Sequence, residues 1–137
     1  MNNLNASLGL SQIKKCLQNV EKRKFNFEFL KENVPSNLGY FTKHDAHSSY
    51  YLSTLILKKK FSSDIMRKEL ANNGVQASFH YPFLHKTEFY KHPSHLPMLS
   101  SLENRIINLP IHQELCQKDL EKIISECVRY SRSRRKS

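Results

Sequence analysis

The sequence has few glycines, few prolines and an odd number of cysteines, and each shortage argues against a class of protein. Three glycines and five prolines among 137 residues argue against a low-complexity or loop-dominated chain. The cysteines Cys16, Cys116 and Cys127 have no paired spacing, so neither a disulfide scaffold nor a cysteine-based metal framework is supported. We expect small buried thiols in a reducing compartment instead.

Long hydrophobic runs are missing as well. The most apolar segment, residues 50–57, is far shorter than the roughly 20 residues needed to cross a bilayer. Residues 1–10 lack the basic run followed by an apolar stretch that is typical of a signal peptide. These absences predict a soluble, cytoplasmic protein with no membrane partner, and the length predicts one domain.

Acidic residues are too few to balance the basic ones, and the formal net charge is +10. Half of this excess comes from the end of the chain, which contains Arg129, Arg132, Arg134, Arg135 and Lys136. The remaining body, at about +5, has an ordinary charge for a sugar-phosphate or nucleotide binder. We expect a domain over residues 1–129 and a basic, disordered tail over residues 130–137.

The spacing of apolar residues predicts a helix at each end of the chain. Apolar residues recur every three to five positions from Leu4 onward, so a long first helix should start at Asn2 or Asn3 and stop before Pro35. The last helix has the clearest pattern, at i, i+3, i+4, i+7 and i+8, with Asp119 near its N-terminus. Its apolar positions are Leu120, Ile123, Ile124, Cys127 and Val128.

Between these helices the pattern is mixed. Residues 33–42 favour a connection, and residues 50–57 and 75–79 favour strands. The helix between the two strands should begin at Ser62 or Ser63, end at Asn73 and Gly74, and turn three side chains inward, those of Ile65, Met66 and Leu70. Residues 98–107 favour another helix that ends before Pro110, with Leu99, Leu102 and Ile106 on one stripe. This order predicts the α+β class.

The irregular segment at residues 80–97 is dense in histidine and aromatic residues. It contains His80, His85, His92 and His95. A loop held between a strand and a helix is a common place for binding residues. A zinc site is one alternative, although no cysteine or carboxylate completes a known ligand pattern, and solvated surface histidines are another. Because the chain has no GxSxG elbow and no glycine-rich phosphate loop, composition and spacing alone predict no reaction.

Four segments follow one another in an order and spacing seen elsewhere. Residues 1–13 read MNNLNASLGLSQI, residues 48–52 SSYYL, residues 75–85 VQASFHYPFLH and residues 101–115 SLENRIINLPIHQEL. Residues 1–13 are similar to a helix start with the pattern RMxxLxAALGLxQL, and residues 48–52 to a strand of a small domain. Residues 75–85 are similar to a strand and loop with the pattern GIxxxxHYxPLH, and residues 101–115 to a segment with the pattern (A/S)ExxxxxxLPxHxxL. These four features resemble the DegT/DnrJ/StrS family of sugar-nucleotide aminotransferases, which depend on pyridoxal phosphate (PLP). The resemblance extends to about Arg129.

The resemblance implies a fold and a separation of functions between two domains. The fold is the small C-terminal domain of a fold-type I aminotransferase, with a small antiparallel-type sheet packed by a long N-terminal helix and a C-terminal helix. In the family a larger domain carries PLP on a lysine, and an amino group passes from glutamate to a nucleotide-linked keto-sugar for polysaccharide, lipopolysaccharide or amino-sugar biosynthesis. No segment of this chain matches that lysine domain, so we expect a fragment that binds no cofactor and is inactive alone.

The same resemblance implies partners and contact residues. The partner would be a PLP-binding large-domain chain or a homodimer mate, and the first helix would expose its apolar face to it. His80 and Tyr81 match the family's cleft-facing His-Tyr pair and His85 matches its second histidine, so these three are expected to bind the nucleotide sugar. Arg105 is a further candidate for a phosphate contact, whereas His112 is expected to be structural. No catalytic, cofactor-binding or metal-binding residue is implied.

A different class of function remains open. The arginine-rich tail and the aromatic residues of the histidine loop could form a basic nucleic-acid-binding module, because clustered positive charge and stacking side chains are the usual means of binding single strands. Steep salt dependence of oligonucleotide binding would distinguish this alternative from the aminotransferase fragment.

Overall fold

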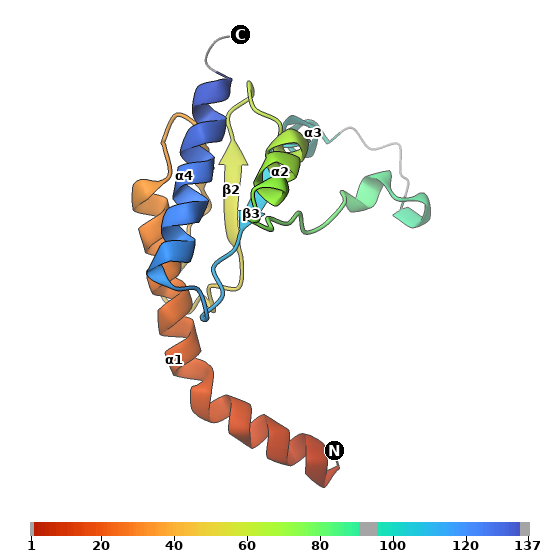
Figure 1. Ribbon diagram of the computed structural model, residues 1–137. Coiled ribbons are helices and arrows are strands. Elements are labelled where there is room, and N and C mark those ends of the chain that lie inside the picture. Colours follow the sequence, from red (N-terminus) through yellow and green to blue (C-terminus); the bar gives the residue numbers. More distant parts are fainter. Residues whose placement is uncertain (1, 91–95, 135–137) are drawn as a thin grey trace.

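A small antiparallel sheet with helices on one face forms the body of the protein in this computed structural model, which describes residues 2–90 and 96–134 (Figure 1). The strands are β1 (Gly39–Phe41), β2 (Ser53–Leu57) and β3 (Ile106–Leu109), in the spatial order β1-β2-β3. The principal helices are α1 (Asn3–Asn33), α2 (Ser63–Asn72) and α4 (Gln117–Ser133). The predicted α+β class, with a small antiparallel sheet packed by a long first helix and a C-terminal helix, is confirmed.

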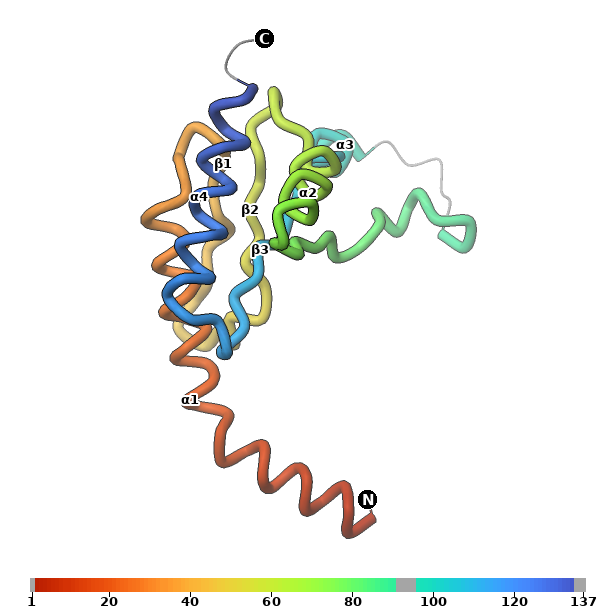
Figure 2. Tube along the Cα trace, in the orientation of Figure 1, coloured from red at the N-terminus to blue at the C-terminus, as the bar shows by residue number. Residues whose placement is uncertain are grey.

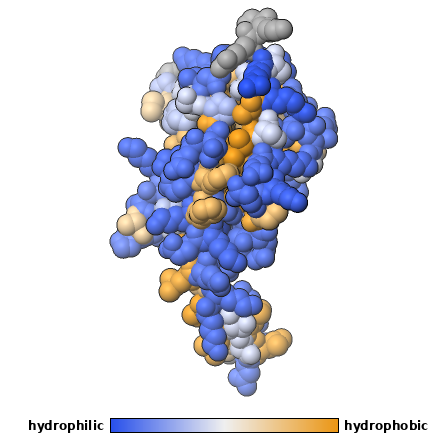
Figure 3. Space-filling model, turned by 60° about the vertical axis from the view of Figure 1, so that its left-hand side comes forward, coloured by the Kyte–Doolittle hydropathy of each residue, from blue (hydrophilic) through white to orange (hydrophobic). Residues whose placement is uncertain are grey.

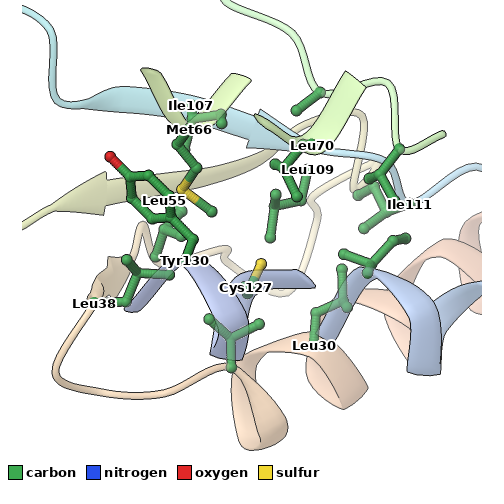
Figure 4. Close-up of a cluster of buried hydrophobic side chains, with 14 of the residues drawn as sticks. Leu30, Leu38, Leu55, Met66, Leu70, Ile107, Leu109, Ile111, Cys127 and Tyr130 are labelled. Carbon is green, nitrogen blue, oxygen red and sulfur yellow. The ribbon is translucent and has the colours of Figure 1, made fainter. Parts of the chain in front are cut away.

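The core lies against one face of this sheet. Side chains alternate along β2, so Ser53, Leu55 and Leu57 are buried while the residues between them are partly exposed. Leu55 pairs with Ile107 across the strands, and helix residues close over both. Figure 4 shows the resulting cluster, which includes Leu30 of α1, Met66 and Leu70 of α2, and Cys127 and Tyr130 of α4.

The first helix begins as predicted, with Asn2 as its cap. The Oδ1 atom of Asn2 accepts a hydrogen bond of 2.9 Å from the Asn5 N–H. Only the second half of α1 packs on the core, through Phe27 and Leu30, while the first half projects from the body (Figure 2). Its apolar residues are therefore exposed, as expected for an unpartnered face (Figure 3). They are Leu4, Leu8, Leu10, Ile13 and Leu17.

The second helix has the predicted ends. Ser62 caps α2, because its Oγ accepts a hydrogen bond from the Ile65 N–H, and Gly74 follows the helix at φ +75°. Met66 and Leu70 are buried as expected. Ile65 is not buried: it is 40% exposed, because it lies off the helix face that buries Met66 and Leu70.

The last helix continues beyond the expected domain boundary at residue 129. It runs to Ser133 because Tyr130 and Ser131 are buried against the core. Arg129 forms an ion pair with Glu126 on the same helix, and Arg134 forms one with Glu69 of α2 at 3.5 Å. Residues 130–134 of the expected tail are therefore ordered against the body, whereas Arg135 and Lys136 lie outside the described residues.

Three sequence-based expectations about smaller elements are wrong. Residues 39–41, expected in a connection, form β1 and pair with β2. Residues 75–79 are not a strand of the sheet, because only Ser78 makes a bridge, to Asn108. The helix expected over residues 98–107 is limited to α3 (Pro97–Ser101); after Asn104, at φ 55°, the chain extends into β3.

The cysteines also differ from expectation. Cys127 is fully buried, but Cys16 and Cys116 are exposed, and all three are free thiols. Cys16 lies on the projecting half of α1, and Cys116 is the N-cap of α4. Among the described residues no helix has the length and hydropathy needed to cross a membrane.

Candidate functional site: a cavity at the end of β3

The face of the sheet opposite the core carries a polar cross-strand pair. Thr54 on β2 lies directly opposite Asn108 on β3, and both alternate with core residues, so they share the other face. The Thr54 hydroxyl donates a 2.7 Å hydrogen bond to Asn108 Oδ1. Asn108 is buried from solvent, at 3% exposure, and its neighbours in the sequence are apolar.

The segment after α2 brings His80 to this pair. Ser78 and Asn108 exchange two backbone hydrogen bonds, of 2.9 and 2.8 Å, which hold the segment along the free edge of β3. His80, two residues later, points the same way as Ser78. Its Nδ1 lies 3.2 Å from Ser78 Oγ and 3.4 Å from Asn108 Nδ2. The peptide bond between His80 and Tyr81 is cis.

Ser78, His80 and Asn108 border a cavity of about 340 Å³. Arg23 of α1 closes one side, and its Nε donates a 3.3 Å hydrogen bond to the Asn19 carbonyl oxygen. No carboxylate lines the cavity within the part of the chain that the structure describes. The lining residues with polar side chains are Arg23, Tyr51, Ser78, His80, Asn108, His112 and Gln113, although most of the lining surface is apolar.

The other two predicted contact residues lie in a neighbouring hollow. Residues 81–90 extend away from the body as an arm (Figure 2). Tyr81 is 71% exposed, and its ring meets that of His80 edge-on, with 5.3 Å between centroids. His85 stacks on Phe83 at 5.8 Å. Tyr81, Phe83 and His85 line a hollow of about 430 Å³ together with Leu96 and Leu99. His92 and His95 lie outside the described residues.

Two further candidates have different positions. Arg105 does not line the cavity: it lies at the opposite end of β3, where its guanidinium donates hydrogen bonds of 2.7 Å to the carbonyl oxygens of Leu57 and Ser101. His112 is structural through its backbone, since its carbonyl oxygen accepts a 3.0 Å hydrogen bond from Asn26 Nδ2. Its side chain is exposed at the cavity, a position that sequence reasoning missed.

The sequence reasoning also missed Arg23 and Asn108. Arg23 lies in a helix far from the loop in sequence, and no motif connects the two. Asn108 could have been predicted, because it is the one polar side chain in the apolar run IINLP. A polar side chain inside a buried strand needs a hydrogen-bond partner.

The cavity does not have the groups that would attach PLP. No lysine lines it among the residues described, and Lys86, the lysine nearest in sequence to the loop, is paired with Glu103. Covalent attachment of PLP requires a lysine amine at the site, so the cavity offers hydrogen-bond donors to a ligand but not that amine. Within residues 2–90 and 96–134, no three His, Cys, Asp or Glu side chains converge as metal ligands.

A helix-covered three-stranded sheet with this element order is the small C-terminal domain of the fold-type I PLP aminotransferases. The aminotransferase TlmJ from Streptoalloteichus hindustanus superimposes with a TM-score of 0.86 at 25% identity, over 97% of this chain and 37% of that one. Helicobacter pylori PseC, described as an aminotransferase involved in the biosynthesis of pseudoaminic acid, superimposes with a TM-score of 0.85 at 22% identity, over 97% of this chain and 38% of that one.

The family follows from the sequence comparison. The profile of the DegT/DnrJ/EryC1/StrS aminotransferase family matches residues 1–128, so the chain belongs to this family. A curated relative, the dTDP-4-dehydro-2,3,6-trideoxy-D-glucose 4-aminotransferase of Saccharopolyspora spinosa, is 27% identical in an alignment of 129 residues that covers 91% of this chain and 33% of the relative. The chain thus spans about a third of the curated relative that it matches.

Proposed function

We propose that this chain is the substrate-facing small domain of an enzyme that transfers an amino group to a nucleotide-linked keto-sugar. The observation that carries the proposal is the family match over residues 1–128, within which His80 borders a cavity that Arg23 and His112 also line. The Saccharopolyspora spinosa relative is named for a dTDP-linked dehydro-sugar. By analogy with this relative, the proposed role of the chain is in amino-sugar or polysaccharide biosynthesis, and its proposed location is the cytoplasm.

The two neighbouring hollows suit the two chemical parts of such a ligand. Arg23, His80 and His112 present donors to phosphoryl or hydroxyl oxygens in the cavity. The hollow with Tyr81, Phe83 and His85 offers flat apolar surface for a sugar ring or base. In this proposal the chain binds and orients the ligand and excludes water from one side.

The amine chemistry is assigned to another part of the enzyme. PLP, when bound, supplies the electron sink for amino-group transfer, and a larger domain would hold it, either in the same protein or in a separate or homodimeric partner. The exposed apolar residues of α1, which include Leu8 and Leu17, are the proposed docking surface for that domain. The 137-residue chain by itself is proposed to be inactive.

The proposal is tested by mapping ligand contacts on the chain. Nitrogen-15-labelled protein is titrated with dTDP-glucose, and backbone amide shifts are followed. We expect saturable shifts at His80, Tyr81 and His85, which the Tyr81→Ala change weakens and the His47→Ala change, at an exposed residue before β2, leaves unaltered. Absence of shifts in the loop at millimolar ligand would contradict the proposal.

The same titration tests the nucleic-acid alternative. A single-stranded oligonucleotide at low salt should cause no saturable shifts, because Arg129 and Arg134 already face Glu126 and Glu69, which reduces the positive charge left for phosphates. Salt-sensitive oligonucleotide shifts centred on Arg132 would favour the nucleic-acid module over the aminotransferase domain.

A further inference from the structure

Two segments far apart in the sequence meet at one end of the body and bring lysines and arginines together there. The C-terminal end of α4 lies beside the turn that connects β2 to α2 (Figure 1). The Tyr130 hydroxyl fixes this contact through its hydrogen bonds to Ser62, and a 2.9 Å hydrogen bond from the Phe61 N–H to the Lys58 carbonyl oxygen closes the turn. We call this part of the surface the basic end, and its cations are Lys58, Lys59, Lys60, Arg105, Arg132 and Arg134.

The positive charge of the basic end is not balanced by carboxylates. Within the described residues no ion pair engages the lysines at residues 58–60 or Arg132. The guanidinium of Arg105 bonds to two carbonyl oxygens, which leaves its charge uncompensated. The acidic residues on the adjoining segments each already face another cation. These pairs are Asp64 with Arg67, Glu69 with Arg134, Glu103 with Lys86, and Glu126 with Arg129.

The side chains beneath the basic end indicate which kind of partner it fits. The rings of Phe61 and Tyr130 are only 3% and 2% exposed, so they cannot stack on the bases of a nucleic acid. Protein interfaces are usually centred on aromatic or aliphatic anchors, but the large exposed apolar side chains of the described residues lie mainly on α1, the arm and α3. Ile65, at 40%, is the nearest in sequence. Positive charge with so few anchors suits a broad anionic surface.

The basic end lies away from the other proposed contacts of the chain. The N-terminal half of α1, which is the proposed docking surface for the PLP-binding domain, projects from the opposite end of the body (Figures 1 and 2). The cavity beside His80 is at the other end of β3 from Arg105. A partner at the basic end therefore need not displace that domain or the ligand.

We propose that the basic end is an electrostatic contact surface for a membrane that contains anionic lipid. Because its cations gather at one end of the body, they can face a flat layer of headgroups without a groove or an inserted segment. Each Lys or Arg near an anionic bilayer strengthens binding about fivefold. The expectation of no membrane partner relied on the lack of hydrophobic runs, which a contact of this kind does not need.

The first experiment measures binding of the 137-residue chain to sedimented vesicles. One set of vesicles contains phosphatidylcholine alone, and the other contains equal amounts of phosphatidylcholine and phosphatidylglycerol. We expect binding to the anionic vesicles only, and we expect added sodium chloride to weaken it because salt shortens the range of the attraction. Equal binding to both sets, or binding to neither, overturns the proposal.

The second experiment locates the contact. The triple variant Lys58→Gln, Lys59→Gln and Lys60→Gln should bind the anionic vesicles about a hundredfold more weakly, since each lysine contributes about fivefold. All three side chains are exposed, and circular dichroism checks that the variant is folded. Undiminished binding by this variant contradicts the proposal.

The matched control removes the same charge from another part of the chain. It carries Lys14→Gln, Lys15→Gln and Lys24→Gln, at exposed positions of α1. We expect this variant to bind the anionic vesicles far more tightly than the variant of residues 58–60. Equal weakening in the two variants would show that net charge, rather than the basic end, attracts the lipid, and the proposal would fail.

A competing single-stranded oligonucleotide distinguishes a lipid surface from a nucleic-acid site. At equal phosphate concentration we expect it to leave the chain on the anionic vesicles. Complete displacement by the oligonucleotide would assign the basic end to nucleic acid and overturn the proposal. None of these outcomes depends on dTDP-glucose, whose contacts with the loop at residues 80–85 are measured separately, so the membrane contact and the proposed function can fail independently.

Discussion

The hydroxyl of Tyr130 on α4 makes two hydrogen bonds to one residue, Ser62. It donates to the Ser62 carbonyl oxygen at 2.9 Å and accepts from the Ser62 N–H at 3.3 Å. Ser62 is also the N-cap of α2, so one side chain ties the last helix to the start of another. The ring of Tyr130 is 2% exposed and packs against Phe61.

Removing this hydroxyl should destabilise the fold. In Tyr130→Phe the backbone groups of Ser62 lose their partner while they remain covered by the ring, which costs about 1–2 kcal/mol of unfolding free energy. Urea unfolding followed by circular dichroism measures the difference. Tyr81→Phe, at a 71% exposed position, should change the midpoint little; an equal effect of both substitutions would contradict the role given to Tyr130.

Alkaline pH should also weaken the fold, through the buried thiol of α4. Burial, with a smaller contribution from the Glu126 carboxylate, raises the pKa of Cys127 from 9.0 to about 12. The unfolded chain therefore gives up this proton from about pH 9, while the folded chain keeps it until about pH 12. Stability is fully present below pH 9 and should fall as pH rises through this window, by up to about 1.4 kcal/mol per pH unit.

The check is a set of urea unfolding curves at several pH values above neutrality. Cys127→Ala should be less stable near neutral pH but should lose less stability as pH rises, whereas Cys16→Ala, at an exposed thiol, should follow the unaltered protein. Burial also raises the pKa of the Tyr130 phenol, which adds to the decline in the same direction, so some alkaline sensitivity should remain in Cys127→Ala. Identical pH profiles for all three proteins would refute this assignment.

Two glycines should respond oppositely to alanine. A Cβ on Gly39 would lie 2.3 Å from the Ile56 carbonyl oxygen of the neighbouring strand, so Gly39→Ala must separate β1 from β2 and should cost about 2 kcal/mol or more. Gly9 lies in the projecting half of α1, with nothing within 4 Å of an added Cβ. Alanine favours the helix over glycine by about 0.5–1 kcal/mol. Gly9→Ala should therefore increase the helical circular dichroism signal without loss of stability. Equal unfolding midpoints for the two variants would be inconsistent with the β1–β2 contact.

The longer helices could be predicted from the sequence because their signals are local. Apolar spacing and end residues such as Asn2 and Gly74 lie within the helices or beside them. The sheet was harder, because pairing partners are distant in sequence. Ile106 fits a helical stripe with Leu99 and Leu102, and only its pairing with Ile56 makes it part of a strand.

The candidate site shows the same limit. His80 could be predicted from the resemblance, since the motif around it is a continuous stretch of sequence. Arg23 and Asn108 reach the same cavity from α1 and β3, and nothing in a single sequence states that these elements meet. The basic residues near the end of the chain suggested solvation from residue 130 onward, whereas α4 continues to Ser133 and Tyr130 is buried beside them.

The central proposal is that this chain contributes to the sugar-nucleotide site of an aminotransferase and does not carry the lysine that holds PLP. The most direct test is to incubate the 137-residue chain with PLP, reduce the mixture with borohydride and determine the intact mass, with the Streptococcus pneumoniae protein Spr1654, whose structure is known in a PLP form, treated in parallel. We predict covalent PLP on Spr1654 and none on this chain. One PLP per molecule on a single lysine of this chain would contradict the account.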